Sequence, residues 1–359
     1  MALGERKTLA GEWLFKGLQR VAGFLRILPL PFDLKFLLFL WIEFLGSLAY
    51  RSWVSGWRKE IDQQAEEATD KTDTTKHKKV AVLLDGTSCR GQVILERLIT
   101  MGYLVIYPDG SSASSDDRVS IKATLDREES AEAFIKKVAV RNPKVDLLVV
   151  NRQRYVRFSK KSNPIPALEK KIIPSKKKKG FITKHGSYRE LDRIMLEKDP
   201  NLRHNYLLNF LVVRGLAEAL KSGEGVVVFC TGRVFNLVQS TVAQVTLPSL
   251  FFSFCYSQMS VVLLGLGTKS RYSYLDVRVV STGVGLADIF GWSILRNKLF
   301  SFWATNTSEY EAAVVKAIIA KKRKELVTYA DAVFKLPFDS NIDGYDRAND
   351  LWEQAEMIS

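Results

Sequence analysis

The chain has 359 residues and is 47% hydrophobic, a composition that excludes general disorder and fits one large α/β domain with an N-terminal extension. Its formal net charge of +14 indicates an anionic partner. The three cysteines, Cys89, Cys230 and Cys255, are scattered in or beside apolar segments, which predicts buried free thiols in a reducing compartment and no disulfide frame.

An apolar region, residues 1–57, begins the chain, and we expect membrane lipid to contact it over residues 12–57. Its run 34–50 carries only two charged residues, Lys35 and Glu43. This pattern predicts a helical membrane anchor, either a spanning helix or an in-plane or hairpin anchor. Glu43 would lie near the middle of a span, which disfavours a simple crossing. The alternative is a helical hairpin that packs on the globular domain or on a partner subunit.

A polar, charged linker, residues 58–78, precedes the globular domain, for which we expect residues 79–325. Strands are predicted at residues 80–84, 103–107, 119–125, 145–150, 225–230 and 276–281. Helices are predicted at residues 92–101, 128–140, 205–220 and 254–266, and from residue 309. This alternation predicts a Rossmann-like doubly wound parallel sheet with helices on both faces. Residues 326–359 are predicted to be a partly ordered tail with a short amphipathic helix near Leu351.

A basic insertion, residues 152–203, interrupts the alternation. It holds 16 Lys or Arg residues against 5 Asp or Glu residues, a net charge of +11. Anionic lipid or an acidic protein would suit it, and a solvated surface is the alternative interpretation. Nucleic acid is disfavoured, because the insertion has few aromatic residues for stacking and no known binding module.

Four features at the ends of the predicted strands and helices resemble a known family. They are the loop 85–92 after the first strand, Asn151 after the fourth, Asn205 in the next helix and Tyr256 in the helix after the fifth. In this order the chain resembles the short-chain dehydrogenase/reductase superfamily over about residues 79–325. Membrane-anchored members that act on retinoids, sterols, sphingoid bases or acyl chains are the most similar in layout. The resemblance implies NAD or NADP as the cofactor.

The loop after the first strand is where the family binds the cofactor pyrophosphate. The family pattern has further glycines four and six residues after the first, whereas here only Gly86 is in register, and Gly91 matches after one inserted residue. Thr87 and Ser88 could donate hydrogen bonds to a phosphate, and Arg90 could pair with a phosphate of the adenosine.

Two further positions concern the cofactor. Asp109 follows the second strand, 23 residues after Gly86, and the alternatives for it are a ribose hydroxyl ligand or an ordinary turn residue. Asn151 matches the family at the end of the fourth strand, but Arg152 and Gln153 place long side chains where the cofactor should pass. Arg152 would have to turn away to admit it.

Tyr256 occupies the place of the family's general acid and base, but Ser260 stands where the required lysine should be. None of the 12 tyrosines has a lysine four residues later. A tyrosine without a nearby cation is a poor base at neutral pH. The resemblance assigns Asn205 to a proton-relay water, with a helix N-cap as the alternative, and Thr231 to the substrate-orienting hydroxyl.

The sequence therefore favours a membrane-associated protein with an eroded dehydrogenase site, a pseudoenzyme that serves as a scaffold, sensor or complex subunit. The alternative is an active NAD(P)-dependent oxidoreductase in lipid metabolism, acting on a hydrophobic ketone or alcohol. We expect an intracellular location at the membrane of the endoplasmic reticulum or mitochondrion. No spacing of histidine, cysteine and carboxylate residues indicates a metal site.

Overall fold

A computed structural model describes most of the chain. The described residues are 17–53, 62–67, 78–110, 114–156, 192–193, 195–238, 250–282, 307–320, 327–330, 334–337 and 344–359. Most of the basic insertion 152–203, and with it the predicted anionic contact surface, lies outside these ranges.

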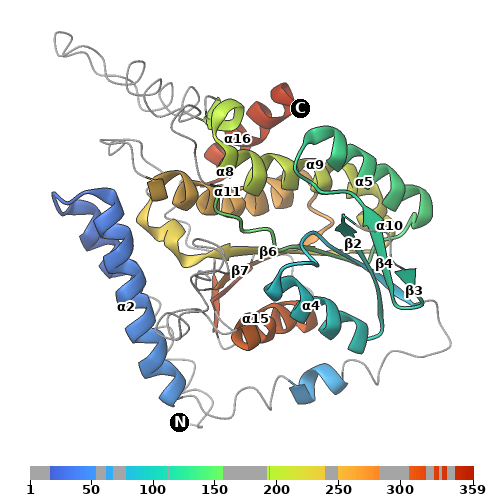
Figure 1. The fold of residues 1–359 in the computed structure, drawn as a ribbon, viewed down its shortest axis with the longest axis horizontal. Helices are drawn as coiled ribbons and strands as arrows, with labels where there is room; N and C mark the ends of the chain where they lie inside the picture. The colour runs from blue at the N-terminus through green and yellow to red at the C-terminus, as the bar shows by residue number, and fades with distance from the viewer. Residues whose placement is uncertain are drawn as a thin grey trace.

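The domain is built on one sheet with the strand order β3-β4-β2-β1-β5-β6-β7-β8-β9 (Figure 1). Every pairing from β4 to β8 is parallel, and the edge strands β3 and β9 pair antiparallel with their neighbours. The strands are β1 (Lys79–Leu83), β2 (Tyr103–Asp109), β3 (Ser114–Ser115), β4 (Arg118–Lys122), β5 (Leu147–Val150), β6 (Val226–Gly232), β7 (Asp276–Thr282), β8 (Val327–Ala330) and β9 (Phe334–Pro337). The order reverses between β1 and β5, which makes this a Rossmann-like doubly wound fold. All six predicted strands are confirmed.

Helices cover both faces of the sheet, because the strand side chains alternate between two apolar layers. Val82 and Leu84 of the first strand and its extension lie in one core, and Ala81 and Leu83 lie in the other. One layer contains α5 (Glu128–Arg141), α8 (Pro200–Leu202), α9 (Leu208–Gly215), α10 (Ala217–Ser222) and α11 (Leu250–Arg271) (Figure 1). The opposite layer contains α4 (Cys89–Thr100) and α15 (Thr307–Ile319).

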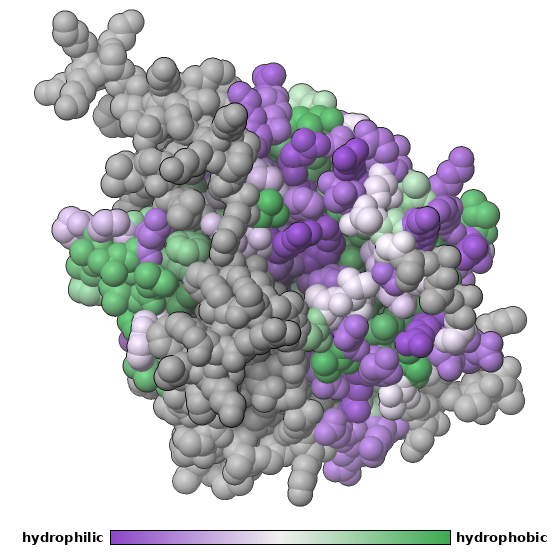
Figure 2. Space-filling model, viewed as in Figure 1, coloured by the Kyte–Doolittle hydropathy of each residue, from purple (hydrophilic) through white to green (hydrophobic). Residues whose placement is uncertain are grey.

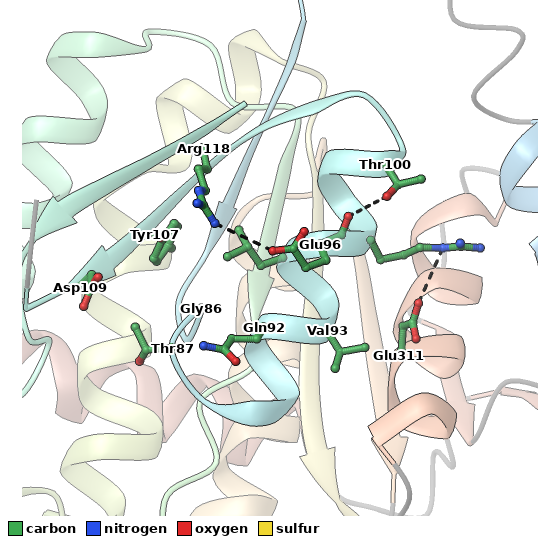
Figure 3. A pocket seen from close by; sticks show the side chains of 12 residues that line it. Gly86, Thr87, Gln92, Val93, Glu96, Thr100, Tyr107, Asp109, Arg118 and Glu311 are labelled. Carbon is green, nitrogen blue, oxygen red and sulfur yellow. Dashed lines mark hydrogen bonds and ion pairs between the residues drawn. The ribbon is translucent and has the colours of Figure 1, made fainter. Parts of the chain in front are cut away.

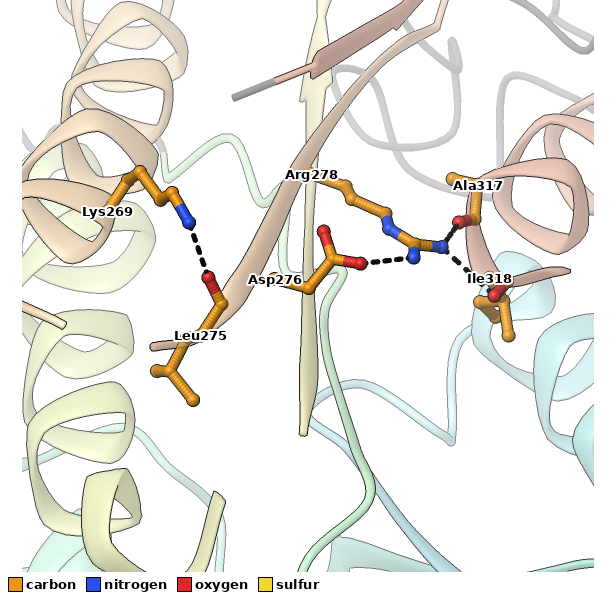
Figure 4. A network of polar contacts seen from close by, with 6 residues as sticks. All are labelled: Lys269, Leu275, Asp276, Arg278, Ala317 and Ile318. Atoms are coloured by element: carbon orange, nitrogen blue, oxygen red, sulfur yellow. Dashed lines mark hydrogen bonds and ion pairs between the residues drawn. The ribbon is translucent and has the colours of Figure 1, made fainter. Parts of the chain in front are cut away.

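A buried arginine fixes the end of α15 to the sheet (Figure 4). Arg278 of β7 donates to the carbonyl oxygens of Ala317 and Ile318 and pairs with Asp276 on the same strand. A cation at a helix C-terminus satisfies the last carbonyls and complements the helix dipole. The contact therefore sets how the second helical layer lies on β7.

Residues 344–358, predicted as a partly ordered tail with a short amphipathic helix near Leu351, are helical and lie against α11. There the chain forms α16 (Gly344–Ile358), which packs along α11. Leu351 and Trp352 are buried in the core, and the Trp352 ring lies edge-on to Phe210 at 4.8 Å between ring centroids. The predicted amphipathic helix near Leu351 exists, but it is longer than expected and its apolar face completes the core.

The apolar run 34–50 forms most of α2 (Phe32–Trp53), which packs on the α11 side of the domain. Phe36 and Phe39 are fully buried there, as the packed-hairpin alternative predicts. Among the described residues, the helix that is long and apolar enough to cross a membrane is Phe251–Arg271 in α11, and 89% of its most apolar stretch is buried inside the protein.

Candidate functional site

Tyr256, the candidate general acid and base, is enclosed by two charged side chains. Its hydroxyl donates to the Asp192 carboxylate and accepts from Arg347 Nη2 at 2.6 Å, while Arg347 Nη2 lies 3.3 Å from Asp192 Oδ1. The three side chains are 1%, 0% and 7% exposed. The cluster joins α11, α16 and the end of the basic insertion, so it links three segments that are distant in sequence.

The environment keeps the proton on the phenol. Burial raises the pKa of Tyr256, because desolvation penalises the phenolate more than the charge of Arg347 favours it. Arg347 supplies the cation that the sequence lacks at Ser260, but the Asp192 carboxylate accepts a hydrogen bond from the phenol and so favours its protonated form. Lys269 does not help, since its ammonium donates to the carbonyls of Ser273 and Leu275.

The Tyr256 hydroxyl also lies on the side of α11 that faces away from the end of β6, where Thr231 is located. Gln258, two residues further on, contacts the end of β6: its side-chain oxygen accepts from the Gly232 amide at 2.9 Å, and its carbonyl accepts from Thr231 at 2.8 Å. Residues two apart on an α-helix point about 200° from each other. Tyr256 and Thr231 are therefore not brought together, and Thr231 serves to fix α11 on the sheet.

The side-chain amide of Asn205 forms hydrogen bonds with backbone groups and with a hydroxyl. Its amide accepts from the Arg154 N–H and donates to the Arg154 carbonyl, both at 3.0 Å, and donates to Ser257 at 2.9 Å. One turn earlier Asn201 makes the same three contacts with Val156 and Ser253. This pair of asparagines holds the chain after β5 against α11. A proton-relay water would have to displace these bonds.

The predicted N-cap at Asn205 is wrong, because Asp199 caps this helix and Asn205 lies in a π-helical turn, Arg203–Leu207. The Asp199 carboxylate accepts from the backbone N–H groups of Asn201 and Leu202 at 2.8 and 3.0 Å. Asp199 is fully buried, and burial raises the pKa of its carboxyl group to about 6. A raised pKa means that the folded state binds the proton more tightly than the unfolded chain does.

We expect Asp199→Asn to remove a pH dependence of stability. Between the unfolded pKa of 3.8 and the folded pKa of about 6, rising pH should cost the wild type about 3 kcal/mol through this group. The amide keeps a capping oxygen and does not titrate. Chemical denaturation measures the free energy of unfolding at pH 4 and pH 7. Between these two values the variant should gain about that much stability relative to wild type. Glu129→Gln, on the exposed face of α5, is the control, and an equal gain there would contradict the assignment.

The loop between β1 and α4 is held by hydrogen bonds among its own residues. Asp85 Oδ1 accepts from the Ser88 N–H at 3.2 Å, and the Ser88 hydroxyl accepts from the Gly91 N–H at 3.0 Å. Asn151 pairs with both the N–H and the carbonyl of Asp85 at 2.8 Å. A Cβ at Gly86 would lie 2.7 Å from the Tyr107 ring. The N-terminus of α4 thus faces a carboxylate and a hydroxyl of its own chain.

A cavity of about 630 Å³ lies beside this loop, between α4 and β2 (Figure 3). Thr87 and Asp109 line it. Its two arginines already face carboxylates, with Arg118 4.0 Å from Glu96 and Arg97 3.8 Å from Glu311. The other lining residues are Gly86, Gln92, Val93, Leu95, Thr100 and Tyr107.

Two other arginines near the sheet edge, Arg90 and Arg152, do not line this cavity. The Arg90 guanidinium lies 4.7 Å from the centre of the Tyr310 ring on α15, and Arg90 is not among the residues that line the cavity. Arg152 donates to the Leu125 carbonyl at 2.5 Å and lies 3.3 Å from His204 Nδ1. Burial, with the charge of Arg152, lowers the pKa of His204 to about 4, so the imidazole is neutral at neutral pH.

These contacts do not suit a dinucleotide. A pyrophosphate needs the free N–H groups of a helix N-terminus and a favourable field, whereas Asp85 places a negative charge there and Ser88 uses the Gly91 N–H. The glycines serve close packing of the loop. Of the seven predicted cofactor residues, Gly86, Thr87 and Asp109 line the cavity, while Ser88, Arg90, Gly91 and Asn151 make contacts within the protein.

No family model and no curated protein matches the sequence. Solved structures of similar fold include a short-chain dehydrogenase from Streptomyces avermitilis, at 14% identity and a TM-score of 0.48, covering 79% of this chain and 96% of that one. A gluconate 5-dehydrogenase from Burkholderia cenocepacia, in complex with NADP and tartrate, has 12% identity and a TM-score of 0.47, covering 70% and 93%. An alcohol dehydrogenase from Thermococcus sibiricus has 16% identity and a TM-score of 0.46, covering 72% and 98%. These values assign no family, and the fold class follows from the strand order.

Sequence reasoning missed Asp85, Asp192 and Arg347. Asp85 carried a signal, because an acidic residue directly before the phosphate loop opposes an anionic ligand. Asp192 and Arg347 carried none, since their contact with Tyr256 depends on how α16 packs. Among the described residues no group of histidine, cysteine and carboxylate side chains could hold a metal ion.

Proposed function

We propose that this chain is a non-catalytic Rossmann-fold protein, a divergent relative of the short-chain dehydrogenases that serves as a scaffold, sensor or complex subunit. One observation carries the proposal: Tyr256 is 1% exposed, and its hydroxyl is bound on both sides, by Asp192 and Arg347. A general acid must reach the substrate within hydrogen-bond distance or through one water. Here both partners of the phenol are protein side chains, which favours a structural role for it.

The other two catalytic candidates support the same conclusion. Asn205 makes three hydrogen bonds that tie the chain after β5 to α11, and Thr231 ties α11 to β6. At the nucleotide end, Asp85 and Ser88 occupy the N-terminus of α4. Proton transfer and pyrophosphate binding are thus impaired by separate sets of contacts, and each set stabilises the fold.

An NAD(P)-dependent oxidoreductase is the second candidate, and Arg347 is the observation in its favour. Its guanidinium lies 2.6 Å from the Tyr256 oxygen, close enough to stabilise a phenolate. The adjacent Asp192 opposes this effect, because it lies 3.3 Å from the same guanidinium and accepts a hydrogen bond from the protonated phenol. We therefore favour the structural role for all three residues.

Thermal unfolding with and without NADH or NADPH tests the proposal. We expect no shift with either nucleotide, whereas a ligand at 100 times its Kd would add about 2.7 kcal/mol of stability. Hydride transfer to hydrophobic ketones should likewise be absent from both the wild type and Tyr256→Phe. A nucleotide-dependent shift, together with a ketone reductase activity that Tyr256→Phe abolishes, would overturn the proposal in favour of the oxidoreductase.

A further inference from the structure

The N-terminal helices form a hairpin on the surface of the α11 layer. Residues 17–27 are helical, and α2 follows after a short turn. Lys35 of α2 donates to the Arg26 carbonyl at 3.0 Å, which satisfies the C-terminal end of the first helix. Leu18, Ala22 and Leu25 are buried on the inner side of that helix. The two helices are therefore held to each other and to the domain.

The inner face of α2 is bound to the domain by rings and by a buried ion pair. Phe36 stacks on Phe251 of α11, with 4.3 Å between ring centroids. Glu43 Oε1 lies 3.2 Å from Arg233 Nη1, and these side chains are only 6% and 4% exposed. If α2 left the domain to cross a bilayer, Glu43 would enter hydrocarbon without its arginine, at a large cost in free energy. The fold thus opposes a spanning α2.

The outer face of the same hairpin is apolar. On α2 the exposed positions that the structure describes are Leu34, Leu37, Trp41 and Leu45, spaced three or four residues apart along one helix face. Phe24 and Ile27 of the first helix, 63% and 80% exposed, extend this stripe. Over residues 17–46, Arg20 is the one charged residue among the described exposed positions. Figure 2 shows the stripe as a green patch at the left edge of the molecule, over α2.

We propose that this apolar stripe, defined as Phe24, Ile27, Leu34, Leu37, Trp41 and Leu45, seats the protein on an anionic lipid bilayer, with α2 lying in the plane of the membrane. An amphipathic helix buries such a face at the boundary between headgroups and acyl chains, where tryptophan is favoured. The net charge of +14 attracts anionic headgroups. The same charge opposes a second copy of the chain as the occupant, because two copies repel each other.

Vesicle flotation of the full-length protein tests the stripe. The wild type should float with vesicles of phosphatidylcholine and phosphatidylserine, and less with phosphatidylcholine alone. The combined change Leu34→Ser, Leu37→Ser, Trp41→Ser and Leu45→Ser should weaken binding by roughly ten-thousandfold, since each of the four lost anchors costs about a factor of ten. The control is Val140→Ser with Met357→Ser, because these side chains are 77% and 68% exposed but lie outside the hairpin. Circular dichroism checks that all variants fold.

The orientation has its own measurement. A fluorophore on Leu37→Cys, in a Cys89→Ser background, should be quenched by lipids labelled near the headgroup more than by lipids labelled at the chain end. Strongest quenching by the deep label would overturn the in-plane orientation. Equal flotation of wild type and the stripe variant would overturn the lipid surface itself. So would a wild type that ignores both vesicles and forms a dimer that the stripe variant breaks, since the stripe would then be a protein interface.

Discussion

Replacing Arg347 by methionine is expected to lower the free energy of unfolding by about 3 to 5 kcal/mol, because it removes one partner of a buried ion pair. The guanidinium contacts both the Asp192 carboxylate and the Tyr256 hydroxyl, and Asp192 is fully buried. Without the arginine, the carboxylate must remain charged in an apolar site or take up a proton. Burial already raises the pKa of Asp192, so we expect the loss to shrink below neutral pH.

Arg271→Met is the matched control, because Arg271 also joins α11 to α16 but lies at the surface. It is 3.8 Å from Glu353, and these side chains are 37% and 47% exposed. An exposed ion pair contributes at most about 1 kcal/mol. Urea unfolding of both variants measures the difference. Equal losses would contradict the buried cluster, whereas partial recovery of Arg347→Met by Asp192→Asn would support it.

This cluster marks the limit of what the sequence could predict for the site. The place of Tyr256 after the fifth strand is a local property, and the absence of a lysine four residues later can be read directly. Arg347 lies 91 residues further along the chain and contacts Tyr256 only because α16 packs on α11. The sequence therefore predicted that the usual catalytic pair is missing, but it could not predict what surrounds the tyrosine instead.

The fold was more accessible, because apolar strands and amphipathic helices are local patterns. The six predicted strands are present, with boundaries shifted by a few residues. The strands β3, β8 and β9 were missed, since they have two to four residues and no apolar run. In α16 the buried residues are spread among charged ones, and a pattern of this kind is also typical of a surface helix. Only its contact with α11 distinguishes the two.

The apolar run 34–50 posed a different difficulty. Its composition is typical of a membrane anchor, and the same composition serves a helix that packs on other helices. Glu43 was the informative residue, because a charge in the middle of an apolar run requires a partner. In the structure that partner is Arg233, the residue directly after β6. It lies 190 residues after Glu43 in the chain. A pairing over such a distance could not be predicted from one sequence.

Gly91→Ala should cost at least about 3 kcal/mol and loosen the start of α4, because it forces overpacking against backbone. An added Cβ would lie 1.8 Å from the Asp85 carbonyl oxygen, far inside contact distance. The loop cannot easily retreat, since Asn151 holds both the N–H and the carbonyl of Asp85 at 2.8 Å. Relief would therefore require α4 to move or these two hydrogen bonds to break. Hydrogen exchange should detect faster opening at the first turn of α4.

Gly110→Ala provides the control, because nothing lies within 4 Å of its added Cβ. We expect it to change the free energy of unfolding by no more than about 0.5 kcal/mol. If Gly91→Ala were equally mild, the loop would have room to widen, and the close packing of Gly91 against Asp85 would not limit the start of α4. If instead the cost is large, close packing against the Asp85 carbonyl requires glycine at this position.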